Sequence, residues 1–415
     1  MGLIYGTNNV RYMPIEDVEK LERYRSGGYH PINIGEWLNS RYCIMARDQK
    51  TNKYVAIKVT IADSAPAQSQ ERNILRRLNT AESKTQSHPR RASIPPILDE
   101  FIIPGPNGEH RCLVTPVGMM SLAEAKDASS FRLFQLPVAR AFSAQLVLAV
   151  AYLHSRGIVH ADLHDGNILV LLPKSMDALS REQLYEKYGR PHHEPVVCLD
   201  ERPLPDGVPA NAVVPIWLGK ASECVSVAEA HVVVTDYGES FMPATTMRHH
   251  SNTPYTLVPP EIHFEPEESL SFSGDIWTLA CTIWTLVGQR PLFEGFNASA
   301  DWVIKENVDT LGKLPPRWWQ RWGSRSRWFN EDGTRQNATS SRPLEQRLAE
   351  SVQEPRQEFN MQPMGDAERS AFLTMMREML AFEPEQRPVA KEIMECEWMQ
   401  QWALPELSRL KRNMS

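Results

Sequence analysis

The segment "IVHADLHDGNILV" (residues 158–170) concentrates side chains that could act together chemically. Its polar residues lie within eight positions and are His160, Asp162, His164, Asp165 and Asn167. Carboxylates and an amide could hold Mg²⁺ or receive a proton, whereas His160, His164 and Asp165 could together hold zinc. A third interpretation is a polar loop whose side chains cap the neighbouring elements.

The sequence on either side indicates how this loop is positioned. Residues 139–157 repeat apolar side chains at three- and four-residue spacing and end in glycine, which predicts a helix. Residues 168–172 ("ILVLL") form a short apolar run that suits a buried strand. A helix and a strand would hold the loop rigidly at a surface.

Other segments contribute groups of matching chemistry. "VAIK" ends in a lysine on a predicted strand, and a glutamate lies on the predicted helix that follows, over residues 62–79. "VVVTDYG" ends an apolar strand with an aspartate, and "TLVPPEIHF" and "GDIWTLACTIWTLV" supply two more acids. Phosphoryl transfer needs a cation for phosphate oxygens, an Asp and an Asn for Mg²⁺, and an Asp for the hydroxyl proton. The residues are Lys58, Glu71, Asp236, Glu261 and Asp275.

In this order and spacing, over residues 38–403, the motifs resemble those of the eukaryotic protein kinases. The resemblance implies that Asp162 is the catalytic base and that Asn167 and Asp236 hold Mg²⁺. Lys58 would contact the phosphates of ATP, with Glu71 as its partner. His164 stands at a third catalytic position. The other nucleotide-binding positions implied are Ala56, Thr115 and Val117.

Two structural pairings follow from the same resemblance. Arg387, in "FEPEQRP", would pair with Glu261, and Asp275 would brace the catalytic loop. The implied fold is α+β and bilobal, with a small β-rich N-lobe and a large, mainly helical C-lobe. The boundaries we predict are an N-terminal extension (1–37), an N-lobe (38–117), a C-lobe (118–403) with an insert (173–230), and a tail (404–415).

Finer features resemble the SR-protein kinases, and their fungal members most. These features are "LERYRSGGYHPINIGEWLNSRY", the insert, and "LPPRWWQRW". The resemblance implies ATP and Mg²⁺ as cofactors and serines of Arg/Ser-rich splicing factors as substrates. It also implies a monomer in the cytoplasm, the nucleus or both.

Composition sets outer limits on function. The net charge of −6 gives no global reason to expect nucleic-acid binding, and the six scattered cysteines favour reduced thiols inside a cell. We see no apolar run near the about 18 residues that a membrane span needs. Neither a nucleic acid nor a membrane is therefore an expected partner.

The largest departure from the kinase pattern lies in "LNSRYCIMARDQKTNKYVAIKV". About fourteen residues, including the Gly-rich loop that covers the phosphates, have no counterpart between "RYCI" and "ARD". Either a short coding stretch is missing from this sequence, or the loop is truly absent and the chain is a pseudokinase scaffold. We predict that "SRYCIMARD" forms one merged strand beside "KYVAIKV", with no loop over the nucleotide.

Two substitutions lie inside the catalytic motif. Ala161 stands where many kinases have an arginine that binds an activating phosphate, so it argues against that mode of activation. His164 replaces a lysine, and the resulting HxDLHxxN string also occurs in aminoglycoside- and choline-type kinases. Against a small-molecule kinase stand "PPE", "DIW" and Arg387, which belong to the protein-substrate architecture.

Three weaker signals have competing interpretations. "RWWQRWGSRSRWF" (residues 317–329) could stack on nucleic acid, or its tryptophans could pack beneath arginine stems, and its "SRSR" could be self-phosphorylated. His249 and His250 could sense pH. The acidic "FEPEES" could attract a basic peptide or simply form a solvated turn.

Overall fold

The computed structural model describes residues 11–45, 47–63, 66–80, 93–295, 299–337 and 342–412. The chain divides into two compact units. The first unit comprises Met1–Arg72, Pro96–Met119 and Leu172–Leu218. The second comprises Asn73–Pro95, Met120–Leu171 and Gly219–Ser415. A β-sheet N-terminal region and a helical C-terminal region confirm the predicted α+β kinase-like fold.

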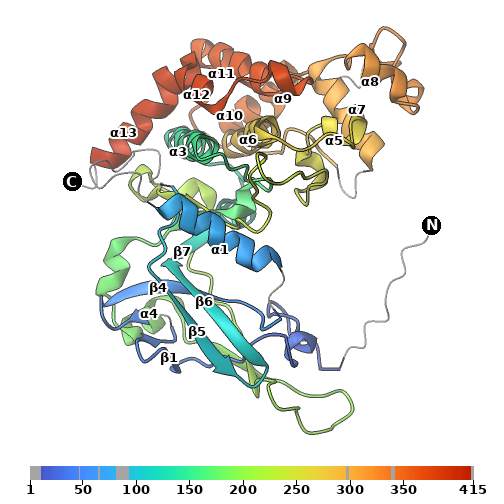
Figure 1. Ribbon diagram of the computed structural model, residues 1–415. Coiled ribbons are helices and arrows are strands. Elements are labelled where there is room, and N and C mark those ends of the chain that lie inside the picture. The colour runs from blue at the N-terminus through green and yellow to red at the C-terminus, as the bar shows by residue number, and fades with distance from the viewer. Residues whose placement is uncertain are drawn as a thin grey trace. The chain divides into compact units, whose positions relative to one another are not determined.

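The first unit is built on a six-stranded antiparallel sheet in the order β1-β2-β3-β4-β6-β5. Figure 1 shows β4, β6 and β5 side by side. One face is the apolar core, formed around Tyr42, Val55 and Val114. Because side chains alternate along a strand, Lys58 lies on the opposite face. The strands are Trp37–Leu38 (β1), Tyr42–Cys43 (β2), Arg47–Asp48 (β3), Lys53–Val59 (β4), Asp99–Gly105 (β5) and Gly108–Pro116 (β6).

The merged strand predicted over residues 40–48 is wrong. β2 and β3 pair antiparallel, with Tyr42 opposite Asp48 and Cys43 opposite Arg47, so the chain reverses direction between these two strands. The prediction ignored the polar contacts that draw the two ends together. Arg41 donates to both oxygens of Asp48 at 2.8 Å and to Asp99 at 2.9 Å. The sequence between the two strands, "IMA", is far too short to be a Gly-rich phosphate loop.

The predicted insert contains secondary structure of its own. Residues Leu172–Leu218 belong to the first unit and contain α4 (Arg181–Tyr188) and a hairpin of β9 (His192–Pro195) with β10 (Asn211–Val214). Arg47 donates to the carbonyls of Asp177 and Leu179 at 3.0 and 2.8 Å. The insert therefore contacts the β3–β4 hairpin through Arg47.

The second unit is organised around two apolar helices, α3 (Leu136–Ser155) and α6 (Phe272–Val287). Figure 1 shows them side by side, and α12 (Ala390–Glu395) and α13 (Leu404–Arg412) pack on α3. By length and composition α3 could cross a membrane, so our statement that no segment comes near this length was wrong. In this fold 89% of its most apolar window is buried, as in the core helix of a folded domain.

The remaining elements of the second unit surround these helices. A small sheet has the order β11-β8-β7. Its strands are Gly118–Ser121 (β7), Ile168–Leu171 (β8) and Val232–Val234 (β11). The helices are α2 (Leu122–Asp127), α5 (Glu261–Phe264), α7 (Ala300–Leu311), α8 (Pro316–Arg321), α9 (Leu344–Leu348), α10 (Glu354–Glu358) and α11 (Asp366–Met379). Helix α1 (Pro66–Asn79) begins in the first unit and ends in the second.

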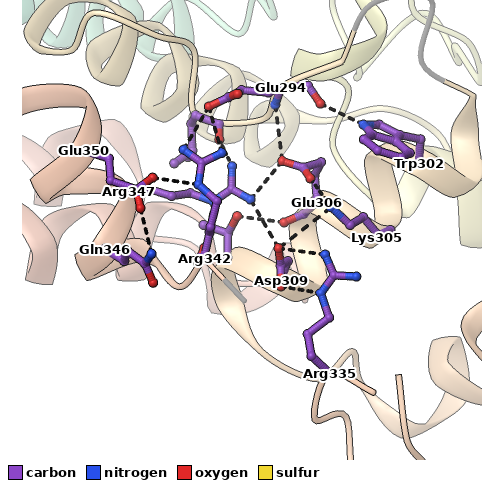
Figure 2. A network of polar contacts seen from close by, with 12 residues as sticks. Glu294, Trp302, Lys305, Glu306, Asp309, Arg335, Arg342, Gln346, Arg347 and Glu350 are labelled. Atoms are coloured by element: carbon purple, nitrogen blue, oxygen red, sulfur yellow. Dashed lines mark hydrogen bonds and ion pairs between the residues drawn. The ribbon is translucent and has the colours of Figure 1, made fainter. Parts of the chain in front are cut away.

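Helix α7 buries charged side chains that would normally face water. Figure 2 shows Glu306 and Asp309 within a network of cations. Arg347 reaches Glu306 at 2.8 Å, Arg335 reaches Asp309 at 2.9 Å, and Lys305 reaches Glu306 at 2.5 Å. Buried charges are tolerated when each has a close partner, so these pairs fix α7 to the segments that follow it.

Candidate functional site

The first unit contains a lysine–glutamate pair. Lys58 lies on β4, and its Nζ is 2.7 Å from Oε2 of Glu71 on α1. The Lys58 side chain remains 53% exposed, whereas that of Glu71 is 12% exposed. The glutamate therefore fixes the lysine stem while leaving the ammonium open to a further anionic ligand. The pairing expected from the resemblance is present.

The predicted nucleotide-binding positions lie close to this lysine in the sheet. Ala56 on β4 is directly opposite Thr115 on β6. Because paired residues share a face, both side chains lie on the same face as Lys58. Val117 follows β6, and its backbone carbonyl accepts a hydrogen bond from Leu172 N. Their role in binding a nucleotide stays a prediction.

The second unit contains the loop between α3 and β8. Asn167 Nδ2 donates to the backbone carbonyl of Asp162 at 2.9 Å and to its Oδ2 at 3.1 Å. Asp162 Oδ1 is buried and makes no hydrogen bond to any residue in the described part of the chain. Asn167 therefore fixes the carboxylate of Asp162 through one oxygen, and the other oxygen has no hydrogen-bond partner among the described residues.

The small sheet brings Asp236 to the same end as Asn167. β11 pairs antiparallel with β8, with Val234 opposite Ile168, so the residue before β8 lies beside the residues after β11. Thr235 confirms this, because its N and Oγ1 donate to the Asn167 carbonyl at 2.8 and 2.9 Å. Asp236 itself is exposed at φ 60°, a conformation that is uncommon outside glycine and is often kept at functional sites.

Asp275 braces the catalytic loop from the start of α6, as the resemblance implied. Its carboxylate accepts from the backbone N–H groups of His160 and Ala161 at 2.8 and 2.9 Å. Burial alone would raise the pKa of Asp275, but the hydrogen bonds that its carboxylate accepts, from His154 and from the Ala161 backbone, oppose it, and that pKa is lowered. The aspartate therefore stays ionised, and it helps hold Ala161 at φ 65°.

The geometry of His160 argues against the zinc interpretation. Its Nε2 lies 3.1 Å from the Thr235 carbonyl, and its Nδ1 accepts from Asp162 N at 3.3 Å. Burial lowers the pKa of this histidine, so it stays neutral at ordinary pH. Among the described residues, no group of three or more His, Cys, Asp or Glu side chains is placed to hold a metal. His160 is an interior structural residue.

His164 lies next to the predicted base without touching it. Its Nδ1 accepts from Gly166 N at 3.1 Å, so the proton of the neutral ring is on Nε2. That nitrogen is 3.8 Å from Asp162 Oδ1, beyond hydrogen-bond reach. Asp165, by contrast, lies in the short turn Asp165–Asn167 just before β8 and takes no part in this arrangement.

The predicted pairing of Arg387 with Glu261 is confirmed. Both guanidinium Nη atoms donate to the two carboxylate oxygens at 2.7 Å, and the Arg387 side chain is fully buried. Arg387 also donates to the carbonyls of Ala381, Ser273 and Phe382. A planar fork of this kind anchors α5 to the α11–α12 region.

Comparison with known proteins agrees with this geometry. Residues 39–177 match the family model described as "Protein kinase domain". The chain carries a protein kinase domain. Its fold is similar to that of a solved structure titled as a kinase domain, with a TM-score of 0.59, 14% sequence identity, and coverage of 89% of this chain and 98% of the other.

Relatives of this kinase carry names from the serine/threonine kinases. A serine/threonine protein kinase of Aspergillus fumigatus is 22% identical over 92% of this chain and 90% of its own length. The kinase SRPK of Physarum polycephalum is also 22% identical, over 92% of this chain and 91% of its own length. The kinase SKY1 of Saccharomyces cerevisiae is 31% identical over 37% of this chain and 23% of its own length. Together with the fold, these findings make the chain a protein serine/threonine kinase that is similar to the SRPK family.

The oxygens of the kinase loop suit a magnesium–nucleotide complex. Because Asn167 uses its amide nitrogen on Asp162, its carbonyl oxygen is left to face a ligand. The exposed Asp236 carboxylate adds a second hard oxygen donor. Mg²⁺ in phosphoryl-transfer enzymes takes one or two such protein ligands and completes its shell with phosphate and water. The residues present therefore fit the cofactor.

Sequence reasoning missed two hydroxyl residues near the base. Thr253 Oγ1 and Ser251 Oγ donate to the carbonyl of Ala161, at 3.0 and 3.4 Å, directly before Asp162. The hydroxyl of Ser251 also donates to that of Thr253 at 2.6 Å. Their position between the DYG and PPE motifs was the available signal.

The tryptophan-rich segment packs inward. Trp318, Trp319 and Trp322 are buried in one cluster with Phe264 and Phe329. The Arg317 guanidinium lies 5.4 Å from the centre of the Trp318 ring. The buried rings are closed to base stacking, which supports the packing interpretation of residues 317–329 over the nucleic-acid one.

Proposed function

We propose that this kinase transfers the γ-phosphoryl group of ATP, with Mg²⁺, to serines of Arg/Ser-rich proteins. The observation that carries the proposal is the fixed Asp162 carboxylate, held by Asn167 and left with one unpartnered oxygen. Asp236 at the same end of the small sheet and the Lys58–Glu71 pair supply the remaining groups that the reaction needs.

The proposed chemistry is an in-line displacement at phosphorus. The serine hydroxyl oxygen forms a bond to the γ-phosphorus, the bond from that phosphorus to the β,γ-bridging oxygen breaks, and ADP leaves. Asp162 Oδ1 receives the hydroxyl proton, and Lys58 contacts the phosphate oxygens. When bound, Mg²⁺ neutralises charge on the phosphates, with Asn167 and Asp236 as its protein ligands.

The substrate class is supported by relatives and by charge. A human relative named SRSF protein kinase 3 is 28% identical over 37% of this chain and 30% of its own length. In the acidic segment after the PPE motif, Glu267 and Glu268 are exposed, whereas Glu265 pairs with Arg317 at 3.0 Å. Exposed carboxylates directly after the PPE motif favour a basic substrate.

The short β2–β3 connection favours a second function, that of a scaffold with impaired nucleotide binding. A Gly-rich loop supplies backbone N–H groups to the phosphates and excludes water from them, and the sequence leaves only three residues between β2 and β3, too few for such a loop. Weak Mg-ATP binding, combined with retained binding of Arg/Ser-rich peptide, would support this function.

One experiment separates the two functions. The purified chain is incubated with Mg-ATP and either an Arg/Ser-rich peptide or the same peptide with alanine in place of serine. Phosphate incorporation into the serine peptide only, abolished by Asp162→Asn, supports the kinase. Peptide binding without incorporation supports the scaffold.

A further inference from the structure

The segment between Asp236 and Glu261 is fastened to the catalytic loop at both of its ends. Near its start, Phe241 exchanges backbone hydrogen bonds with Val159 at 2.9 and 3.1 Å. Near its end, Thr253 donates to the Ala161 carbonyl at 3.0 Å. Between these points the chain loops outward, and Met247 is 78% exposed. A contact between residues 239 and 248 would close this loop where it leaves the rest of the segment.

Arg248 is placed to do so. Its Nη1 donates to the backbone carbonyl of Glu239 at 2.7 Å and to the Glu239 carboxylate at 2.5 Å. Its guanidinium carbon lies 5.4 Å from the centre of the Phe241 ring. The arginine side chain is only 16% exposed, so water screens the pair weakly. Residues 239 and 248 are thereby joined across the loop.

The backbone of Arg248 is held from a third side. Its N–H donates to Ser269 Oγ at 3.1 Å, and its carbonyl accepts from Leu270 N at 2.7 Å. His249 Nδ1 is also 3.1 Å from the Glu268 carbonyl. The residues that precede Ser251 and Thr253 therefore cannot shift without breaking contacts to residues 268–270.

We propose that Arg248 is a positioning residue that acts through Glu239. By closing the loop over residues 239–248, it holds Ser251 and Thr253 on the carbonyl before Asp162 and so keeps the substrate-facing segment aligned with the base. Both charged groups of this ion pair, the Arg248 guanidinium and the Glu239 carboxylate, belong to the unmodified chain, so no phosphorylation is needed to form it. This inference rests on the proposed kinase function for its catalytic consequence, but its structural part stands by itself.

The geometry dictates the variants for the test. Only one nitrogen of Arg248 makes the polar contacts to Glu239, so a lysine ammonium can replace it, whereas a neutral glutamine cannot replace the charge. We expect Arg248→Gln to lower kcat for an Arg/Ser-rich peptide at least tenfold, with little change in the KM for ATP. Arg248→Lys should recover most of that loss. Arg369→Ala, which removes an exposed ion pair with Asp366 on α11, is the matched control.

A second readout does not depend on catalysis. In hydrogen–deuterium exchange of the full chain, Arg248→Gln should speed exchange of the amides over residues 242–254 at least tenfold and leave α3 unchanged. Equal exchange and a kcat within twofold of wild type would overturn the inference. Suppose that the wild-type chain transfers no phosphate. If Arg248→Gln and wild type then exchange equally fast, both proposals are overturned. If Arg248→Gln exchanges faster than wild type, only the proposed function is overturned. Should Arg248→Gln fail to fold, the double variant Glu239→Arg, Arg248→Glu decides, because it should restore the protection that Arg248→Glu alone removes.

Discussion

Asn167 donates its side-chain N–H groups to the backbone carbonyl and to the carboxylate of Asp162, at 2.9 and 3.1 Å. One amide nitrogen thus fixes the orientation of the predicted base, while the side-chain oxygen of Asn167 takes no part in these two hydrogen bonds. The predicted proton acceptor and a predicted metal ligand are therefore mechanically coupled, and a change in one disturbs the other.

This coupling predicts the effect of Asn167→Asp. The variant keeps an oxygen for Mg²⁺ but replaces the donor by a carboxylate that repels Asp162, so the base loses its orientation. We expect kcat to fall on the order of 100-fold, as is typical when one catalytic group is misplaced. Steady-state kinetics with saturating Mg-ATP measures it. Asn330→Asp, at an exposed turn, should stay within twofold of wild type, and an equally active Asn167→Asp would refute the coupling.

Lys58→Met tests the cation of the first unit. The substitution keeps a stem of similar length and removes the charge that Glu71 fixes, so kcat/KM for ATP should fall on the order of 100-fold. Lys53→Met is the matched control, because Lys53 begins the same strand and is exposed. Similar losses in the two variants would mean that the strand, and not the ammonium, is responsible.

The ion network of α7 predicts a stability effect. Arg347→Met leaves Glu306 buried without one of its cations, and removal of one partner from a buried pair costs about 3–5 kcal/mol of unfolding free energy. Urea denaturation of the full chain measures the change. Arg369→Ala, whose arginine is 44% exposed and whose partner Asp366 is 95% exposed, should alter stability by about 0.5 kcal/mol or less. Comparable losses in both would show that the buried network adds no special stability.

Lys126 predicts an unusual pH dependence. Burial lowers the pKa of Lys126 to about 7, although the negative charge of Asp165 opposes part of this shift. The Lys126 Nζ donates to the carbonyls of Thr285 and Gly288 near the end of α6. Between pH 7 and the unfolded value of 10.5, the unfolded chain binds the extra proton, so stability rises with pH. The gain approaches about 1.4 kcal/mol per pH unit at most.

Lys126→Met should remove this rise. The variant also loses the hydrogen bonds to the two carbonyls, which lowers its unfolding free energy by the same amount at every pH. The difference in unfolding free energy, wild type minus variant, should therefore increase from pH 7 to pH 9 because only the wild type contains the titrating lysine. Denaturant titrations at several pH values measure the difference. A difference that stays flat over this range would show that Lys126 does not titrate there.

Local patterns were sufficient to predict the catalytic loop and its flanking elements. The apolar periodicity before residue 158 and the run after Asn167 correspond to α3 and β8. The pairings of Lys58 with Glu71 and of Arg387 with Glu261 followed only from the family resemblance, because they join residues 13 and 126 positions apart.

Other features depend on contacts that no local pattern contains. The β2–β3 hairpin is held by Arg41, which reaches Asp99 on a distant strand. The charged residues of α7 look like an exposed helix face, and they are buried only because Arg335 and Arg347 arrive from later in the chain. The insert, similarly, gained its place from contacts to Arg47 and Tyr54.

The central claim is that the described arrangement around Asp162 transfers phosphate although the β2–β3 connection lacks a Gly-rich loop. The most direct test is a single-turnover assay at saturating Mg-ATP, in which protein exceeds an Arg/Ser-rich peptide, for wild type and Asp162→Asn. We predict a phosphoserine product whose rate of formation falls at least 100-fold in the variant, as expected for loss of a general base. Equal rates in both proteins, or no product in either, would contradict the claim.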